Sequence, residues 1–465
     1  MCFIKIGISI YSLLLFWTIF RIFINIKNPS KTLLWLFVVI CIPIIGIVLF
    51  RIFGRSIKRD AYFNKRKPFN QTLENDIPDI MKQHPKRRLI ELLNKNRSSA
   101  FKPNNSVEVF TNGFKSFEAF FSALLQAKHH IHLEFYILEP GKNLDTIISI
   151  VEKKIKEGVE VRIIYDGFGS SDLSASYLAK LKSIGTYTAI YMPFLSNHKI
   201  KYINYRNHRK IVLIDNEVAF IGGMNISDKY INYDNKEGLW KDTLVKISGP
   251  SAHDIEHVFN CDWLNADGKP YKLTENLLDK TEIGSPVQVV SGGPDSEYMG
   301  ILHQYFTIIT DAEKYVYLIT PYFVPTNTIL TALVTSALSG IDVRIMLPYN
   351  SDSKWLKWCT FSFIEELLAA GVKIYLYHDG FLHGKVMISD DIISSVGSAN
   401  VDERSFTSNF EINAIVYNRE TTIQLKENFY DNLNYSEELT LADFKNRNDR
   451  NKIMESIARL TSPIL

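Results

Sequence analysis

The chain has 465 residues, of which 46% are hydrophobic and 22% charged, so its composition is globular and excludes disorder throughout. The length allows about two to four domains. Lys and Arg number 53 against 50 Asp and Glu, and the net charge of +3 gives no reason to expect a nucleic-acid partner. The four cysteines are Cys2, Cys41, Cys261 and Cys359. Because they lie far apart, without a CxxC pair or zinc-ligand spacing, they favour a reducing compartment over a disulfide scaffold.

Two apolar runs near the N-terminus predict a transmembrane hairpin over residues 1–53. Leu33 to Phe50 carries no charge and is long enough for one membrane-spanning helix. Ile6 to Phe20 is shorter, and it extends to the required length if Arg21 reaches the lipid headgroups. The alternative is a signal peptide with Lys5 as its charged flank. That alternative is disfavoured because no small-residue cleavage site follows and a second apolar run comes at once.

Basic residues around these runs predict the orientation of the hairpin. After the second run the chain carries Arg51, Arg55, Lys58, Arg59, Lys65, Arg66 and Lys67. The connection between the runs carries only Arg21, Lys27 and Lys31. Since basic flanks stay on the cytoplasmic side, we expect a multi-pass protein of the cell membrane whose large C-terminal part is cytoplasmic.

The remaining sequence is organised as two diverged copies of one pattern, after a predicted linker or membrane-proximal segment over residues 54–105. In the first copy, apolar strands are expected at 131–138 and 158–165, with a helix between them. In the second, they are expected at 315–320 and 340–347. Short strands alternating with helices predict an α/β fold of two homologous halves, each a mixed sheet flanked by helices. The halves are placed at 106–270 and 285–465, the second ending in an amphipathic tail helix.

One constellation of polar residues occurs once in each half. From each histidine, a lysine follows at two residues, an aspartate at seven, a glycine at fourteen and an asparagine at seventeen. The first copy consists of His208, Lys210, Asp215, Gly222, Gly223 and Asn225, and the second of His383, Lys385, Asp390, Gly397, Ser398 and Asn400. Because side chains alternate along a strand, each histidine and its lysine are expected on the same face. For one His-x-Lys pair a solvated strand edge would be the better interpretation, but the shared offsets make chance a poor explanation.

These residue types suit attack on a phosphodiester. Two lysines, two asparagine amides and backbone N–H groups can stabilise the charge on a phosphoryl group. One histidine can attack phosphorus while the other protonates the leaving oxygen, which requires one histidine from each half. No DxD, EF-hand or His/Cys pattern is present, so we expect no metal and no cofactor.

A nucleophilic histidine needs a partner that keeps the proton on its other ring nitrogen. Asp242 and Glu411 follow their histidines by 34 and 28 residues and are the candidates for this role. Ordinary surface ion pairing is the alternative, because the two offsets differ.

Four further histidines and two tryptophans do not indicate a function. His129, His130, His132 and His378 are more often polar surface or strand residues than ligands. Trp355 and Trp358 fit either a contact with the membrane interface or a helix that packs its tryptophans inward.

The doubled His-x-Lys-x4-Asp pattern resembles the phospholipase D superfamily. Within it, the chain resembles the bacterial cardiolipin synthases in the two N-terminal runs and in four further segments. These are 204–210, 320–325, 380–385 and the terminal Ser462-Pro463. The resemblance covers essentially the whole chain.

The resemblance implies that two phosphatidylglycerol molecules give cardiolipin and glycerol through a phosphatidyl-histidine intermediate. It implies that His208 is the nucleophile and His383 the general acid, which the two copies do not themselves distinguish. Asp215 and Asp390 are grouped with the catalytic motif, although their position predicts that they support it from behind. Gly223, Asn225, Ser398 and Asn400 are expected to bind substrate, with a hydroxyl contact to phosphate from Ser398 alone.

Three alternatives remain open. A hydrolytic phospholipase D would share every catalytic residue and differ only in accepting water. A nuclease of the same superfamily would need a basic, aromatic-lined groove, which the near-neutral charge and the apolar N-terminus make unlikely. A non-catalytic membrane scaffold would be expected to have lost a histidine or lysine, and none is missing. The resemblance implies phosphatidylglycerol and cardiolipin in the bilayer as the partners.

Overall fold

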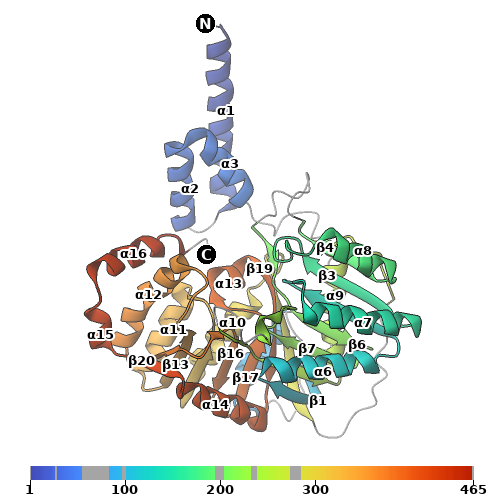
Figure 1. The fold of residues 1–465 in the computed structure, drawn as a ribbon. Coiled ribbons are helices and arrows are strands. Elements are labelled where there is room, and N and C mark those ends of the chain that lie inside the picture. The colour runs from blue at the N-terminus through green and yellow to red at the C-terminus, as the bar shows by residue number, and fades with distance from the viewer. Residues whose placement is uncertain are drawn as a thin grey trace.

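The structure, a computed structural model, describes residues 2–26, 29–54, 83–96, 101–193, 204–231, 238–272 and 284–462. It consists of three N-terminal helices and a larger body made of two halves (Figure 1). Most of the predicted linker and basic flank, and the terminal residue Pro463, lie outside the described residues.

The N-terminal helices are α1 (Cys2–Asn25), α2 (Pro29–Cys41) and α3 (Pro43–Phe53). The prediction of one continuous helix through Leu33 to Phe50 is wrong, because α2 and α3 are separate helices that fold back on each other. Proline at position 43 disfavours helical geometry at the preceding residue, and Ile42 has φ −126° and ψ 71°. Gly46 then lets the two helices approach closely, since a Cβ there would meet the backbone of Val38.

No helix in the part of the chain that the structure describes is both long enough and apolar enough to cross a membrane.

The body contains helices and strands in the alternating order expected of an α/β protein. The first half consists of β1 (Phe101–Phe110), α6 (Gly113–Gln126), β2 (His130–Phe135), α7 (Lys142–Lys156), β3 (Glu160–Asp166), α8 (Ala175–Ser183), β4 (Tyr187–Tyr191), β5 (Arg206–Asn207), β6 (Ile211–Ile214), β7 (Val218–Gly222), β8 (Trp240–Lys241), β9 (Leu244–Ser248) and α9 (Ser251–Asn265).

The second half repeats this order and adds a C-terminal extension. It consists of β10 (Ser285–Gly292), α10 (Gly300–Thr310), β11 (Tyr315–Ile319), β12 (Phe323–Val324), α11 (Asn327–Leu338), β13 (Asp342–Pro348), α12 (Lys354–Ala369), β14 (Lys373–Tyr377), β15 (Phe381–Leu382), β16 (Val386–Ser389), β17 (Ile393–Gly397), β18 (Val401–Asp402), α13 (Glu403–Thr407), β19 (Asn409–Val416), α14 (Arg419–Leu433), β20 (Ser436–Leu439), α15 (Leu441–Lys445) and α16 (Asp449–Arg459).

The two halves share one continuous sheet rather than having one sheet each. The strand order is β20-β14-β13-β11-β16-β17-β19-β10-β1-β9-β7-β6-β2-β3-β4, with β5 paired to β19. Outward from the central antiparallel pair β1 and β10, the equivalent strands come in the same order on both sides. The repeat seen in the sequence is therefore a repeat of strand topology, related across the centre of the sheet.

Helices cover both faces of this sheet, as its buried strands require. In β2 and β11 every residue is buried. On one face, α9 and α14 pack in a core shared by both halves, with Ile255 and Phe429 fully or almost fully buried. At the equivalent positions Gly158 and Gly340, φ is +93° and +91°, so glycine ends the preceding helix and turns the chain into β3 and β13.

The segment predicted as a linker includes an element of the body. Helix α5 (Arg87–Lys95) buries Leu89, Ile90 and Leu93 in the core of the second half. Strand β1 begins at Phe101, five residues before the predicted boundary of the first half.

Candidate active site

Each histidine lies between a two-residue strand and a core strand. His208 follows β5 and precedes β6, and His383 follows β15 and precedes β16. The histidines and lysines are therefore just before the core strands, not on them as predicted. Strand β5 pairs in parallel with β19 of the second half, and β15 pairs in parallel with β8 of the first. The short strand before each histidine is therefore hydrogen-bonded to the opposite half of the molecule.

Backbone hydrogen bonds continue this pairing at the histidines themselves. The N–H of His208 donates to the carbonyl of Phe410 at 2.9 Å, and the N–H of His383 donates to that of Lys241 at 2.7 Å. Glu411 and Asp242, the two carboxylates predicted from the sequence, follow directly after Phe410 and Lys241.

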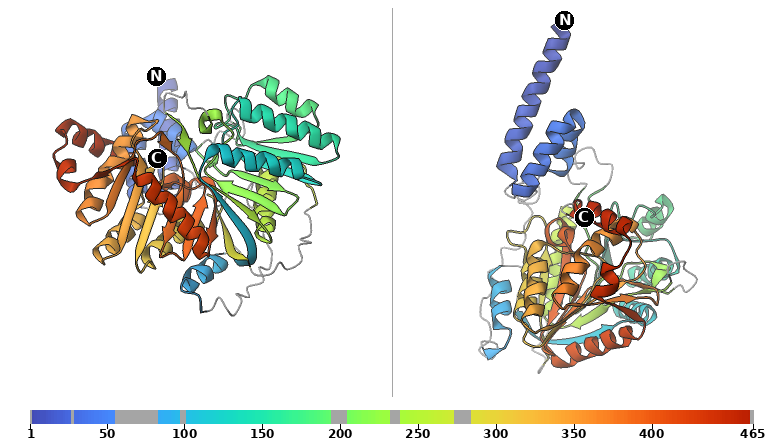
Figure 2. Two further views of the ribbon diagram at one scale, coloured as in Figure 1. Left: turned by 60° about the horizontal axis from the view of Figure 1, so that its bottom comes forward. Right: turned by 90° about the vertical axis from the view of Figure 1, so that its left-hand side faces the viewer.

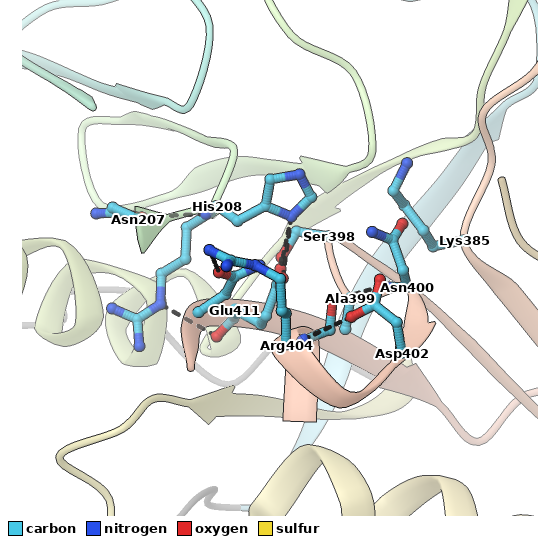
Figure 3. A network of polar contacts seen from close by, with 12 residues as sticks. Asn207, His208, Lys385, Ser398, Ala399, Asn400, Asp402, Arg404 and Glu411 are labelled. Atoms are coloured by element: carbon cyan, nitrogen blue, oxygen red, sulfur yellow. Dashed lines mark hydrogen bonds and ion pairs between the residues drawn. The ribbon is translucent and has the colours of Figure 1, made fainter. Parts of the chain in front are cut away.

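Asp242 and Glu411 contact the histidines, but each contacts the histidine of the other half. His208 Nδ1 lies 3.0 and 3.1 Å from the two carboxylate oxygens of Glu411 (Figure 3). His383 Nδ1 lies 2.7 Å from Oδ2 of Asp242. The expected pairing within each copy is wrong, because the short strands before the histidines cross to the opposite half. In both pairs the carboxylate faces Nδ1, which leaves Nε2 for chemistry.

Burial and neighbouring charges keep both histidines neutral. Burial lowers the pKa of His208 to about 4, against the opposing effect of Glu411. Burial, followed by the positive charges of Lys385 and Lys210, holds the pKa of His383 well below its usual value. The charge of a lysine from each half therefore acts on His383, so the two motifs form one site.

The carboxylates differ between the two pairs. Burial raises the pKa of Asp242 to about 7. Burial also raises the pKa of Glu411, but His208, Lys210 and the hydroxyl of Ser398 together outweigh it and hold the pKa below its usual range. Glu411 is thus ionised near neutral pH, whereas Asp242 binds a proton there.

Both motif lysines are buried and turn back towards their histidines. Lys210 Nζ donates to the carbonyl of His208 at 2.5 Å, and Lys385 Nζ donates to the carbonyl of His383 at 2.5 Å. Lys385 Nζ also lies 3.1 Å from Nδ1 of His383. Burial lowers the pKa of Lys385 to about 8.

The two motif asparagines have different surroundings. Asn225 Oδ1 accepts a hydrogen bond from the N–H of Ile137 at 3.1 Å. Oδ1 of Asn400 is buried and has no hydrogen-bond partner among the described residues. The Asn400 amide is therefore the better placed of the two to meet a ligand.

The glycine and serine of the motifs accommodate the carboxylates. A side chain at Gly223 would collide with the carboxylate of Asp242. At the equivalent position, the hydroxyl of Ser398 donates to Oε2 of Glu411 at 2.5 Å. The hydroxyl thus contacts the carboxylate, and its expected contact with phosphate stays a prediction.

Asp215 and Asp390 lie at the far ends of β6 and β16, away from the histidines. A four-residue strand at about 3.3 Å per residue separates each aspartate from its lysine. Asp215 accepts from the backbone N–H groups of residues 128, 129 and 130. Asp390 accepts from those of residues 313, 314 and 315, and also pairs with Lys86 at 2.7 Å. Both support the sheet from behind, so their grouping with the catalytic residues is wrong.

Several residues around the site were missed from the sequence. Arg209 hydrogen-bonds the carbonyls of Glu411 and Gly292 and also pairs with Asp262, so it joins the two halves beneath His208. Lys229 and Arg404 each lie 21 residues after a motif histidine. Extending the repeat beyond the asparagines would have found these two cations.

Lys229 and Arg404 stand beside aromatic and polar groups of the site. Lys229 Nζ lies 5.1 Å from the ring centre of Trp240, whose ring centre is 4.9 Å from that of His383. The guanidinium of Arg404 donates to the side chain and carbonyl of Asn204 at 2.9 and 3.0 Å.

One cluster outside this site has the residue types of a metal site. The ligand atoms of His130, His132 and Glu256 lie within 4.8 Å of one another. The two imidazoles stack with 4.6 Å between ring centres and 27° between planes, so their in-plane lone pairs do not converge. Arg162 also lies 3.3 Å from Nε2 of His132. This geometry does not fit a cation.

Comparison with known proteins gives matches over most of the chain. A family model described as "Cardiolipin synthase, PLD-like domain" matches residues 120–263 and 305–433. Another, described as "Phospholipase_D-nuclease N-terminal", matches residues 13–55. Cardiolipin synthase 2 of Bacillus anthracis is 39% identical over 459 residues, which are 96% of this chain and 88% of that protein. Cardiolipin synthase of Clostridium perfringens strain 13 is 38% identical over 454 residues, 94% and 95% of the two chains.

Solved structures show the same fold at lower identity. Phosphatidylserine synthase of Haemophilus influenzae matches with a TM-score of 0.60 and 14% identity, covering 82% of this chain and 100% of that one. The family model and the relatives together show that this chain belongs to the cardiolipin synthase family of phospholipase D-like proteins.

Proposed function

We propose that the protein is a cardiolipin synthase that transfers a phosphatidyl group between two phosphatidylglycerol molecules, giving cardiolipin and glycerol. Its family membership and the names of its relatives support this proposal. The observation that carries the chemistry is the pair of histidine–carboxylate contacts, each built across the two halves. In each of these two neutral imidazoles, Nδ1 contacts a carboxylate and Nε2 is available for chemistry.

In the first step, Nε2 of His208 forms a bond to phosphorus and the bond from phosphorus to the glycerol oxygen breaks. A proton from Nε2 of His383 goes to that oxygen while Nδ1 takes up the proton carried by Asp242, and glycerol leaves. In the second step, a hydroxyl of another phosphatidylglycerol gives its proton to His383 and its oxygen bonds to phosphorus. The bond between phosphorus and His208 then breaks, with its electron pair returning to the imidazole.

The difference between the two carboxylates supports these roles. His208, with a pKa of about 4, faces an ionised Glu411 and is ready to attack. His383 and Asp242, whose pKa is about 7, share a proton that the pair can release near neutral pH. A general acid works best with a pKa near the working pH, so the His383–Asp242 pair suits the leaving group.

The stabilisation of charge on phosphorus is assigned to Lys210, Lys385 and the Asn400 amide. The two lysines are buried, where a positive charge interacts strongly with a phosphoryl group. No step in this mechanism uses a metal or a cofactor.

We further propose that α1 to α3 attach the protein to the cell membrane, in a multi-pass arrangement with the body on the cytoplasmic side. Among the residues that the structure describes, more than half of the exposed large apolar side chains belong to residues 2–54. An apolar surface of this size needs a lipid environment. Lys31 of this unit pairs with Glu403 of α13 at 2.7 Å, next to Arg404 at the site. The site therefore lies near the end of the body that would face lipid.

The test is incubation of the membrane-embedded protein with phosphatidylglycerol alone, in the presence of a chelator. Cardiolipin and glycerol in equal amounts, lost in both His208→Ala and His383→Ala, are expected. Phosphatidic acid as the main product would instead indicate the hydrolytic phospholipase D alternative. Activity that survives either substitution would contradict the shared site.

A further inference from the structure

Helix α16 turns an apolar stripe away from the body. Ile453, Ile457 and Leu460 are 59%, 45% and 76% exposed. Their spacing of four and three residues places them on one face of the helix. On the other side, Glu455 and Ala458 are 3% and 0% exposed. The helix thus packs through a small residue and a paired carboxylate while its large aliphatic residues face outward, the reverse of a usual surface helix.

The helix is held firmly in this orientation. Glu455 accepts from the guanidinium of Arg447 at 2.7 Å, and Arg447 also lies 3.2 Å from Glu365 of α12. At the C-terminal end, the indole of Trp355 donates to the hydroxyl of Thr461 at 2.9 Å. These contacts show that the stripe is a defined surface of the folded body.

Basic side chains flank the stripe. Arg450, Lys452 and Arg459 lie on the same helix. Lys452 is 3.4 Å from Asp449, and Arg459 is 3.6 Å from Glu366. An outward apolar face bordered by Lys and Arg is typical of a helix that lies in the headgroup region of an anionic bilayer.

The position of α16 agrees with such a contact. In Figures 1 and 2, α16 lies at the end of the body nearest to α1, α2 and α3, whereas α14 lies at the opposite end. A bilayer that contained the N-terminal helices would therefore be on the side of the molecule where α16 lies.

We propose that α16 lies in the surface of the anionic bilayer and is a second membrane attachment of the protein. This inference rests on the proposed membrane attachment of α1 to α3. Two attachments far apart in the sequence would restrict the tilt of the body relative to the membrane and keep the site directed towards lipid substrates. A second copy of this chain is the other possible occupant of the stripe, which the following test distinguishes.

The test uses the full chain in vesicles of phosphatidylglycerol and phosphatidylcholine, with single cysteines carrying an environment-sensitive fluorophore. Cys2 and Cys261 are replaced by serine in every variant, and the buried Cys359 is retained. Cys41 is replaced by serine in all variants except the one in which it carries the label. The labelled positions are Ile457→Cys on α16, Gln424→Cys on α14 as the control, and native Cys41 on α2, which is exposed. Each is measured with spin-labelled lipid and with aqueous iodide as quenchers.

We expect spin-labelled lipid to remove about half of the fluorescence at position 457 and little at 424, with position 457 protected from iodide. Access of iodide to position 457 would overturn the inference. Protection from both quenchers would overturn it as well, by indicating a second copy of the chain. If lipid quenches position 41 but not 457, only the role of α16 fails, whereas no quenching at 41 would remove the proposed attachment of α1 to α3.

The contribution of the stripe is then tested with Ile453→Ser, Ile457→Ser and Leu460→Ser combined. These side chains are exposed, so the melting temperature should remain unchanged. Because α1 to α3 keep this variant on the vesicles, we expect cardiolipin formation to require a several-fold higher mole fraction of phosphatidylglycerol in the vesicles for half-maximal rate, with the maximal rate retained. An unchanged requirement for phosphatidylglycerol would contradict the proposal.

Discussion

The two halves of the body share a strand order but differ at the site. Each supplies a histidine and a lysine to the centre and a carboxylate to the histidine of the other half. In one pair, Glu411 receives the hydroxyl of Ser398. In the other, Asp242 occupies the space that a side chain at Gly223 would fill. The symmetric backbone brings the histidines together, and the unequal carboxylate environments provide different protonation states, which suit the two roles proposed above.

The largest effects are expected at the histidines. In both His208→Gln and His383→Gln, cardiolipin formation should fall by at least about 1,000-fold. The first variant loses the proposed nucleophile and the second loses the proposed general acid. A phosphatidyl donor with a nitrophenol leaving group needs little protonation, so it separates the two roles. We expect it to phosphatidylate the His383→Gln variant and not the His208→Gln variant, as measured by mass spectrometry.

Equal melting temperatures of both variants and the parent protein are the control for this experiment. Phosphatidylation of His208→Gln alone would reverse the assignment of nucleophile and acid. Phosphatidylation of neither would argue against a covalent histidine intermediate.

Substitution of Gly223, next to Asp242, and of Ser398, next to Glu411, tests whether activity requires the difference between the two carboxylates. Gly223→Ser should lower kcat by about 100-fold, because Asp242 must move and loses its position against His383. Ser398→Ala should lower kcat by about 10-fold, through loss of a hydrogen bond to a charged group. Initial rates on phosphatidylglycerol vesicles measure both effects, with Ser398→Gly as the matched variant. Equal losses at the two positions would show that the halves are functionally equivalent.

The pH dependence should show the two pairs separately. Below about pH 4, His208 becomes protonated and can no longer attack. The raised pKa of Asp242, about 7, means that the His383–Asp242 pair loses its proton as pH rises above that value. We therefore expect kcat/KM to fall about tenfold per pH unit above pH 7.

Substitution of each carboxylate should assign this alkaline decline. In Asp242→Asn the decline should move to lower pH, because the pKa of His383 itself lies well below its usual value. In Glu411→Gln the decline should stay near pH 7. A decline that moves only in Glu411→Gln would contradict the roles proposed here.

The motif aspartates should affect stability much more than chemistry. Lys86 and Asp390 are both buried, and Lys86→Met leaves the carboxylate without its cation. We expect the free energy of unfolding to fall by about 3 kcal/mol. Asp215→Asn, which weakens only hydrogen bonds to backbone N–H groups, should cost about 1 kcal/mol. Denaturant unfolding measures both, and rates of the folded variants should stay within about twofold of the parent, since neither residue is at the site.

Repetition along the chain was enough to predict the histidines and lysines of the candidate site and the class of fold. The equal offsets in the two motifs identified His208, His383 and their lysines, and the alternation of strands and helices indicated an α/β protein of two halves. Glycines 158 and 340 mark equivalent helix ends, because only glycine adopts their positive φ without strain. Lys229 and Arg404 also occupy equivalent positions in the two copies, 21 residues after His208 and His383. Local propensity and repetition are properties of the chain alone.

Which residues meet at the site depends on how the two halves pack together. The sequence paired Asp242 with His208 and Glu411 with His383, whereas the contacts are exchanged, because β5 and β15 each pair with a strand of the opposite half. The contact between the hydroxyl of Ser398 and Glu411 was also not predicted from the sequence. Hydropathy also predicted one helix where Pro43 separates two. The two histidine–carboxylate contacts join residues that are 203 and 141 positions apart, and no local pattern encodes a contact over such a distance.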